Sequence, residues 1–161
     1  MSVPKIYLET TMFSFYYETR TATPYPKLKS EVHRIFDLIK AGEYEPYTST
    51  ITTNEIDNTE DQEKRDKMWN LIEEYGITVL ETSLDAEKST ACYINERVVS
   101  PSWTTDATHI AISVVSCLDF IVSLNFTHIA RPWTIEHVRR VNMREKLNPI
   151  GIYKPVAKNR R

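Results

Sequence analysis

Residues 5–11 read KIYLETT, and this stretch places a carboxylate at the point where a buried strand ends. The apolar, β-prone run over residues 3–8 predicts the strand, and Glu9, Thr10 and Thr11 follow it directly. A carboxylate and hydroxyls at this point either cap the next helix or belong to a functional site. The rest of the sequence is needed to choose between these two interpretations.

The composition is that of one soluble globular domain. The chain has 161 residues, of which 41% are hydrophobic and 26% charged, and this is enough for a core without disulfide or metal cross-links. Cys92 and Cys117 are too few for a secreted disulfide framework, so we expect both to be reduced and buried. The sequence shows no signal peptide and no run of about 18 apolar residues, which indicates a cytoplasmic protein that does not enter a membrane.

The charge is distributed unevenly along the chain. The formal net charge is −2, but residues 131–161 contain nine Lys or Arg and two Glu, whereas residues 1–130 contain eleven basic and twenty acidic residues. A basic segment on an acidic body is typical of a phosphate-binding surface. On charge alone, however, the favoured explanation of this basic segment is a solvated helix and tail that bind no phosphate.

Strand and helix patterns alternate along the chain. Strands are predicted at residues 3–8, 44–48, 77–80, 119–124 and 150–153. Helices are predicted at residues 11–17, 28–40, 52–56, 61–75, 84–98, 105–117 and 134–147. This alternation predicts an α/β fold with a mostly parallel sheet covered by helices on both faces. Ligands of such sheets bind beyond the carboxyl ends of the strands, and Glu9 lies at such an end.

Three further polar residues occupy comparable positions: Glu55 in TSTITTNEI, Asp106 in TTDATHIAIS and Asn125 in DFIVSLNFTHI. Each has a structural explanation by itself, as a capping-box residue, a helix-dipole partner and a turn residue respectively. Because all of them follow strands or begin helices, we expect them to converge with Glu9 at one edge of the sheet. Three carboxylates there would repel one another without a cation, and clustered oxygen ligands select Mg²⁺ or Mn²⁺. Such an ion would activate water for phosphodiester hydrolysis.

These segments, in this order and spacing, resemble a PIN domain over residues 3–153, most specifically over Asp106–Ile129. The likeness is to prokaryotic single-domain PIN proteins related to the ribonuclease toxins of toxin–antitoxin pairs. It implies a PIN-like three-layer fold with a central parallel sheet of four or five strands, an acidic Mg²⁺ or Mn²⁺ pocket, and RNA as the usual substrate. We therefore divide the chain into a PIN-like domain at residues 1–153 and a basic C-terminal tail at residues 154–161.

The resemblance assigns catalytic positions to four residues: Glu9, Glu55, Asp106 and Asn125. The three acids among them would hold the metal, and Thr10 or Thr11 matches the hydroxyl that orients the first acid. The family commonly has Asp where this chain has Glu9 and Asn125. The longer first acid moves its carboxylate by about 1.5 Å, and the neutral amide leaves at most one tightly bound ion expected without substrate.

Two histidines lie close to these positions in the sequence. His128 is expected to support the site by fixing the loop that follows Asn125, with a phosphate contact as the alternative. His109, three residues after Asp106, is expected to pack in the core or lie at the surface rather than to reach the pocket. Contacts with RNA phosphates are expected from the basic segment, at Arg131, Arg139, Arg140 and Arg144.

The leading hypothesis is a metal-dependent endoribonuclease that forms a homodimer and acts as the toxin of a toxin–antitoxin pair, held inactive by a small antitoxin protein. Two alternatives stay open. Asn125 motivates the first, a catalytically weak or inactive PIN-like module that binds RNA or protein. The second is a structure-specific DNA nuclease, since related folds cut DNA flaps.

Overall fold

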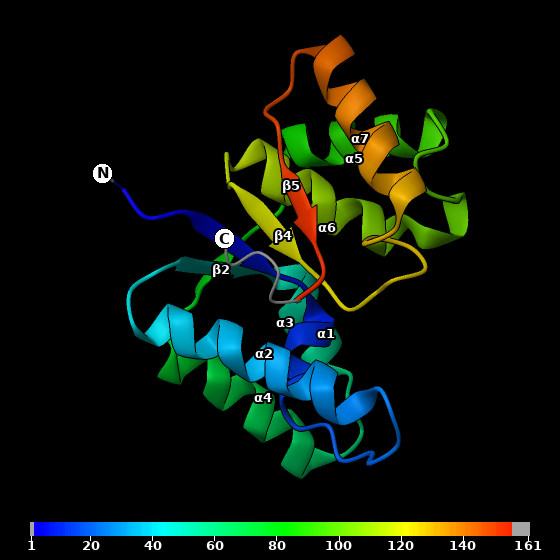
Figure 1. Ribbon diagram of the computed structural model, residues 1–161. Helices are drawn as coiled ribbons and strands as arrows, with labels where there is room; N and C mark the ends of the chain where they lie inside the picture. Colours follow the sequence, from blue (N-terminus) through cyan, green and yellow to red (C-terminus); the bar gives the residue numbers. More distant parts are fainter. Residues whose placement is uncertain (1, 156–161) are drawn as a thin grey trace.

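The computed structural model describes residues 2–155, which build a five-stranded, fully parallel sheet (Figure 1). The strands are β1 (Lys5–Leu8), β2 (Glu45–Ser49), β3 (Thr78–Leu80), β4 (Phe120–Val122) and β5 (Gly151–Tyr153). They lie in the order β3-β2-β1-β4-β5, so the chain winds outward from β1 in one direction and then returns to its other side. The direction of winding therefore reverses between β1 and β4, which is where parallel sheets bind ligands.

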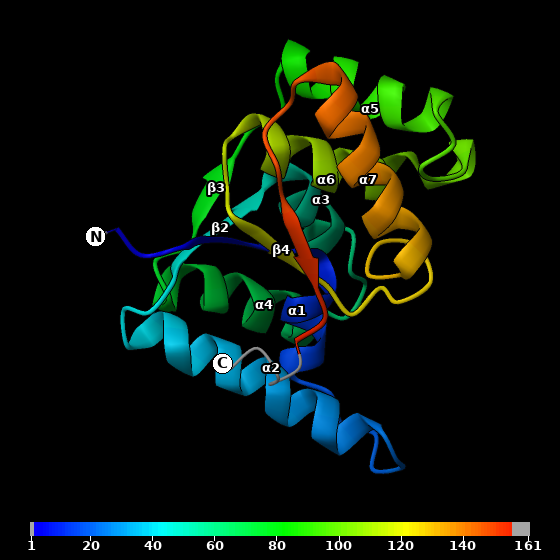
Figure 2. The ribbon, with the colours of Figure 1, turned by 45° about the horizontal axis from the view of Figure 1, so that its top comes forward.

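Seven α-helices and one short 3₁₀ helix surround the sheet within residues 2–155. They are α1 (Thr10–Tyr16), α2 (Tyr25–Lys40), α3 (Thr50–Asp57), α4 (Gln62–Glu74), α5 (Leu84–Asn95), the 3₁₀ helix Pro101–Trp103, α6 (Thr104–Val115) and α7 (Pro132–Glu145). Figures 1 and 2 show α2 and α4 on one face of the sheet and α5, α6 and α7 on the other. This three-layer arrangement confirms the predicted fold class. Among residues 2–155, no helix combines the length and apolarity needed to cross a membrane.

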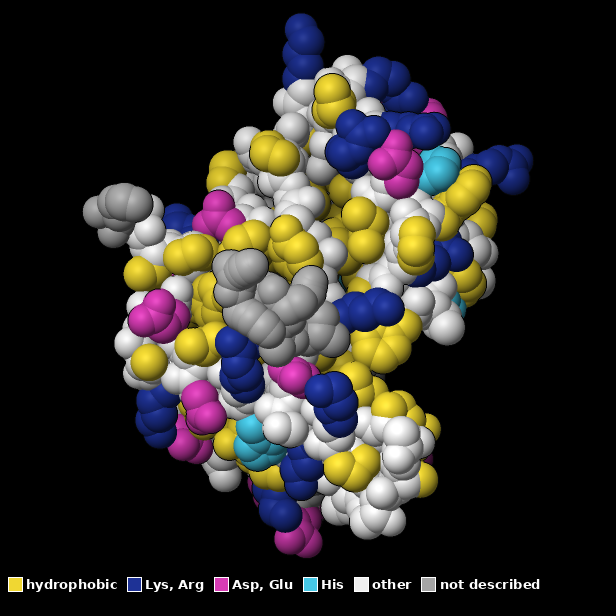
Figure 3. Space-filling model, viewed as in Figure 1, with side chains coloured by type: hydrophobic (Ala, Val, Ile, Leu, Met, Phe, Trp, Pro, Cys, Tyr) yellow, Lys and Arg dark blue, Asp and Glu magenta, His cyan; other side chains and the backbone are white. Residues whose placement is uncertain are grey.

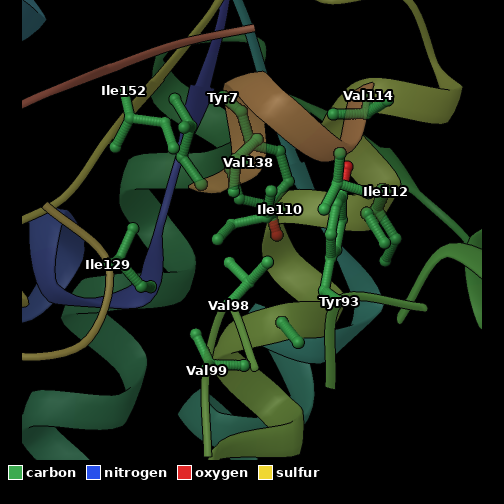
Figure 4. Close-up of a cluster of buried hydrophobic side chains, with 14 of the residues drawn as sticks. Tyr7, Tyr93, Val98, Val99, Ile110, Ile112, Val114, Ile129, Val138 and Ile152 are labelled. Carbon is green, nitrogen blue, oxygen red and sulfur yellow. The ribbon is translucent and has the colours of Figure 1, made fainter. Parts of the chain in front are cut away.

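The central strand β1 supplies side chains to two separate cores. Ile6 and Leu8 pack with α1, α2 and α4, whereas Tyr7 packs with α5, α6 and α7 on the opposite face. Figure 4 shows this second core, in which Tyr7 lies near Ile110 and Val138. Because β1 is buried on both faces, its sequence is a continuous apolar run rather than an alternating one.

Several helix ends differ from those predicted, each for a local reason. Helix α2 begins at Tyr25, earlier than expected. Pro26 fits in its first turn because proline has no backbone N–H, and the N–H groups of the first turn have no partner within the helix. Helix α5 ends at Asn95 because Arg97 adopts a left-handed conformation, with φ of 61°. A residue with left-handed backbone ends a helix even where the apolar pattern continues beyond it.

Cys92 and Cys117 are both free, as predicted, but they are not both buried. Cys92 is partly exposed, and Cys117 is exposed just after the end of α6, with a positive φ of 60°. Its position in a tight turn, rather than in the helix predicted for residues 105–117, explains its exposure. Residues 156–161 of the predicted basic tail lie outside the described part of the chain.

The core beneath α5 and α7 contains a buried side-chain hydrogen bond that can be tested directly. Tyr93 is fully buried, and its hydroxyl donates to Asn142 Oδ1 at 2.6 Å. Tyr93→Phe leaves this acceptor unsatisfied and is expected to lower the free energy of unfolding by about 1–3 kcal/mol in urea denaturation. Tyr153→Phe, at an exposed tyrosine, is the control and is expected to change it by less than about 0.5 kcal/mol. Equal midpoints for the two variants would contradict the assignment.

Candidate active site

The four predicted site residues lie at the carboxyl edge of the sheet. Glu9 directly follows β1, Glu55 lies in α3 directly after β2, Asp106 lies in the first turn of α6, and Asn125 follows β4. Hydrogen bonds join these segments, from β1 to the end of β4 and from α1 to α3. The parallel strand order thus brings together residues that are far apart in the sequence.

Glu9 caps α1 and also bonds across the sheet. Its Oε1 accepts hydrogen bonds from Thr11 N at 3.2 Å, from Thr11 Oγ1 at 2.5 Å and from Ser123 Oγ at 2.6 Å. Thr11 Oγ1 in turn accepts from Leu124 N at 2.8 Å. Glu9 is only 4% exposed, so this carboxylate is held by the protein rather than by solvent. The two interpretations of KIYLETT are therefore compatible: the same carboxylate caps a helix and lies at the reversal point.

Asp106 is held on both of its oxygens by the segment after β4. Its Oδ1 accepts from Asn125 Nδ2 at 3.2 Å, and its Oδ2 lies 2.8 Å from His128 Nδ1. Asn125 Oδ1 also accepts from the backbone N–H of His128 at 3.0 Å, which closes the loop between the two residues. The His128 ring stacks on Trp103, with a centroid separation of 3.6 Å. The geometry thus places His128 against both the loop and the carboxylate.

Glu55 does not take part in the predicted capping box. The N-cap of α3 is Ser49, whose Oγ accepts from Ile51 N, and Glu55 lies farther along the helix. Its Oε1 instead accepts from Thr10 Oγ1 and lies 3.3 Å from His109 Nε2. Burial raises the pKa of Glu55, but the hydrogen bonds from His109 and Thr10 outweigh burial and lower the pKa below its ordinary value. Glu55 is therefore an ionised carboxylate at neutral pH.

His109 is the main residue that sequence reasoning did not assign to the site. It is fully buried, and its Nδ1 lies 2.6 Å from the hydroxyl of Tyr7, which also contacts Ser49 Oγ at 2.7 Å. The favoured expectation of core packing is confirmed, and the less favoured alternative also has support, because the other ring nitrogen of His109 lies 3.3 Å from Glu55 Oε1. The available signal was its position one helical turn after Asp106.

The oxygen donors at this edge have the chemistry that Mg²⁺ and Mn²⁺ prefer, but they do not form the predicted three-acid cluster. Within residues 2–155, no group of three or more His, Cys, Asp or Glu side chains is arranged to hold one ion. Glu9, Glu55 and Asp106 each point to different neutral donors. The set still fits Mg²⁺, which binds proteins through one or two carboxylates and completes its coordination with water and substrate phosphate.

Most of the predicted phosphate-binding arginines are paired with acids on the surface. Arg139 and Arg140 both bond to Glu136, and Arg144 bonds to Glu96. Figure 3 shows the Lys and Arg side chains gathered over α7 with acidic side chains between them. Exposed pairs of this kind contribute about 0–1 kcal/mol each, so a phosphate can compete with them at little cost.

Arg131 differs from the other three because it lies beside the site and is bonded to uncharged groups. Its Nε donates to Thr134 Oγ1 at 2.7 Å and its Nη2 to the carbonyl of Val98 at 3.3 Å. Its guanidinium also lies over Trp103, 5.0 Å from the ring centroid, and Trp103 stacks on His128. Arg131 therefore connects the start of α7 to the segment that precedes α6, at Val98 and Trp103.

The parallel five-stranded sheet between helices is a PIN-like α/β fold. The structure is similar to a chain of VapBC2 from Rickettsia felis bound to a DNA fragment from their promoter, with a TM-score of 0.52 and 8% sequence identity. The match covers 93% of this chain and 98% of that chain, and at this identity it shows the fold alone. No family model matches the sequence, and no match was found among curated proteins.

Proposed function

We propose that the protein is a metal-dependent endoribonuclease of the PIN family that hydrolyses RNA phosphodiester bonds. The observation that carries this proposal is the chain of hydrogen bonds from Glu9 through Ser123 to Asn125 and Asp106 at the reversal point between β1 and β4. Glu55 is joined to the start of α1 by its bond to Thr10. The structural match to the VapBC2 chain supports the fold on which the proposal rests. The sequence resemblance to ribonuclease toxins supplies the substrate class.

In this proposal, one or two of the carboxylates of Glu9, Glu55 and Asp106 would bind Mg²⁺ or Mn²⁺ directly and the others through water, and Asn125 completes the rim. When bound, the ion would polarise a phosphoryl oxygen of the substrate and activate a water. The chain's own contribution is to fix the oxygens that face the substrate before it arrives. Thr11 fixes Glu9, while Thr10 fixes Glu55. Outer partners of this kind typically change metal affinity or activity by about 10–100-fold when they are removed.

The first test compares cleavage of matched single-stranded RNA and DNA by the purified protein. Cleavage is expected for RNA in the presence of Mg²⁺ or Mn²⁺, and none with a chelator, because the proposed reaction relies on the ion to polarise the phosphoryl oxygen and to lower the pKa of the attacking water. Cleavage of DNA flaps alone would replace the RNA assignment with the DNA nuclease alternative. Failure to cleave RNA, together with no binding of millimolar Mn²⁺, would contradict the enzyme proposal.

A catalytically weak or inactive RNA- or protein-binding module is the second candidate. Two observations favour it: the neutral amide of Asn125 at a position where the family commonly has an acid, and the dispersed directions of the three acids. Such a module would retain RNA binding in a filter-binding assay without any metal-dependent cleavage. In either case, the phosphate contacts are assigned to Arg131, Arg139, Arg140 and Arg144.

We also propose that the protein acts as the toxin of a toxin–antitoxin pair, with a small antitoxin partner, and that it forms a homodimer. The structural neighbour was solved as VapBC2 with a DNA fragment from their promoter, which supports a search for a paired protein. A neighbouring reading frame that encodes a small DNA-binding protein would support the pair. Light scattering of the purified chain measures the oligomeric state.

A further inference from the structure

We propose that His109 is a positioning residue that orients the carboxylate of Glu55 through hydrogen bonds relayed from Ser49 and Tyr7. The inference rests on the proposed function, because Glu55 matters for catalysis only if this edge of the sheet is an active site. The relay crosses the fold from β2 through β1 to α6 and ends on α3. It therefore connects the central sheet to the exposed side of the site.

The relay is buried, so its polar groups depend on one another. Ser49, Tyr7 and His109 are each fully buried, and solvent does not reach them. Ser49 Oγ and Tyr7 Oη are 2.7 Å apart, Tyr7 Oη and His109 Nδ1 are 2.6 Å apart, and His109 Nε2 lies 3.3 Å from Glu55 Oε1. Buried polar groups that lack partners are costly, which selects an arrangement in which every donor has an acceptor.

Counting protons gives the relay one direction. An ionised Glu55 only accepts hydrogen bonds, so His109 Nε2 must carry a proton. In a neutral imidazole, Nδ1 is then bare and accepts from the hydroxyl of Tyr7, whose oxygen in turn accepts from Ser49. Ser49 Oγ accepts from Ile51 N at 3.2 Å, which completes the chain. Every relay proton points toward Glu55, and the polar side-chain atoms of Ser49, Tyr7 and His109 all have partners.

The consequence for Glu55 is a fixed orientation. Thr10 and His109 both donate to Oε1, and within residues 2–155 no hydrogen bond engages Oε2 of this side chain, which is 42% exposed. A half-exposed Glu loses rotamer entropy when it is ordered and would otherwise sample several rotamers. The His109 ring resists rotation because it packs edge-on against Tyr7, with an interplanar angle of 65°. One carboxylate oxygen is thus held while the other stays available.

A histidine that only packs in the core would be equally buried, so burial does not test the proposal. The test therefore compares two amide substitutions that differ in whether they reach Glu55. His109→Gln places an amide N–H near the position of Nε2 and is expected to keep its bond to Glu55. His109→Asn places its amide near the position of Nδ1 and does not reach Glu55. We expect kcat for single-stranded RNA with Mn²⁺ to fall by about 10–100-fold in His109→Asn, with KM changed little, and to stay near the parent value in His109→Gln. Equal kcat values in two folded variants would overturn the proposal.

Two readouts do not require activity. The ¹⁵N NMR spectrum of the parent protein is expected to show His109 protonated on Nε2 with a bare Nδ1, and Tyr7→Phe is expected to abolish this preference. Crystal structures are expected to show Glu55 in place in His109→Gln and rotated away in His109→Asn. A parent protein protonated on Nδ1, or Glu55 unmoved in His109→Asn, would overturn the relay. If these readouts hold while the parent protein cleaves no RNA, the proposed function fails and the relay stands.

Discussion

Replacing Asp106 with Asn is expected to lower the rate of RNA cleavage by about 100-fold or more, because Asp106 is a proposed metal-binding residue and loss of an outer partner alone typically costs about 10–100-fold. Asp106 is held on Oδ1 by Asn125 and on Oδ2 by His128, at 3.2 and 2.8 Å. The amide keeps the size of the carboxylate but removes the charge that would attract a cation. The new NH₂ group also faces either Asn125 Nδ2 or His128 Nδ1, where the carboxylate oxygen was. Single-turnover cleavage with Mn²⁺ measures the loss of rate, and titration with Mn²⁺ alone measures the loss of metal affinity.

Asp85→Asn is the matched control for Asp106→Asn. Asp85 also lies in the first turn of a helix, but it is exposed on α5 and takes no part in the site. Each substitution removes a favourable interaction with the helix dipole of about 0.3–1 kcal/mol. Asp106→Asn also disturbs the hydrogen bonds to Asn125 and His128, so it is expected to lose more stability than Asp85→Asn. Only Asp106→Asn is expected to lose cleavage. If both variants cleave RNA like the parent, Asp106 is outside the machinery.

The fold was readable from the sequence because its strands are short apolar runs separated by helices. β1 and β4 are buried on both faces, and their patterns are continuous rather than alternating, which is typical of central parallel strands. The position of Glu9 at a reversal point followed from this reading once β4 was placed next to β1. The strand pairing itself required the structure, because no local pattern in residues 5–8 names residues 120–122 as their neighbours.

The end of β2 shows why the start of α3 was misread. Residues 48–53 contain five Ser or Thr residues, and each of these types serves as an N-cap. Ser49 is selected because its extended backbone still belongs to β2, while Thr52 and Thr53 are buried in the helix. Thr52 is therefore not an N-cap, and Glu55 bonds to Thr10 and His109 instead of to a cap residue. The sequence alone offers several Ser and Thr residues that could cap α3 equally well, and only the structure identifies Ser49 as the cap.

The role of His109 was hidden for a different reason. Helix α6 is buried around much of its circumference, so no polar face indicates which way a single histidine points. Its partner Tyr7 is 102 positions away in the sequence, and its contact with Glu55 spans 54 positions. Likewise, the strand ends predicted that three acids would lie at one edge, but not the directions of their side chains. Those directions depend on long-range donors such as Ser123 for Glu9.

The second large effect is expected at Glu9, where helix capping and site chemistry can be separated. Glu9→Ala removes the cap of α1, worth about 0.5–2 kcal/mol, and leaves buried donors of Thr11 and Ser123 without an acceptor, worth about 1–3 kcal/mol. We expect the free energy of unfolding to fall by about 2–4 kcal/mol. Calorimetry should record a Tm lower by about 4–16 °C, at the usual scaling of about 2–4 °C per kcal/mol for a domain of this size.

Two further variants assign this loss to its causes. Asp61 is an exposed acidic N-cap on α4 whose side chain accepts from Lys64 N at 3.2 Å, so Asp61→Ala is expected to cost about 0.5–2 kcal/mol. Any excess cost of Glu9→Ala then measures the links from Glu9 to the hydroxyls of Thr11 and Ser123. Glu9→Gln keeps an acceptor oxygen but no charge, so it should retain most of the stability while losing cleavage. A Glu9→Gln variant that cleaves RNA like the parent would leave Glu9 as a helix cap and nothing more.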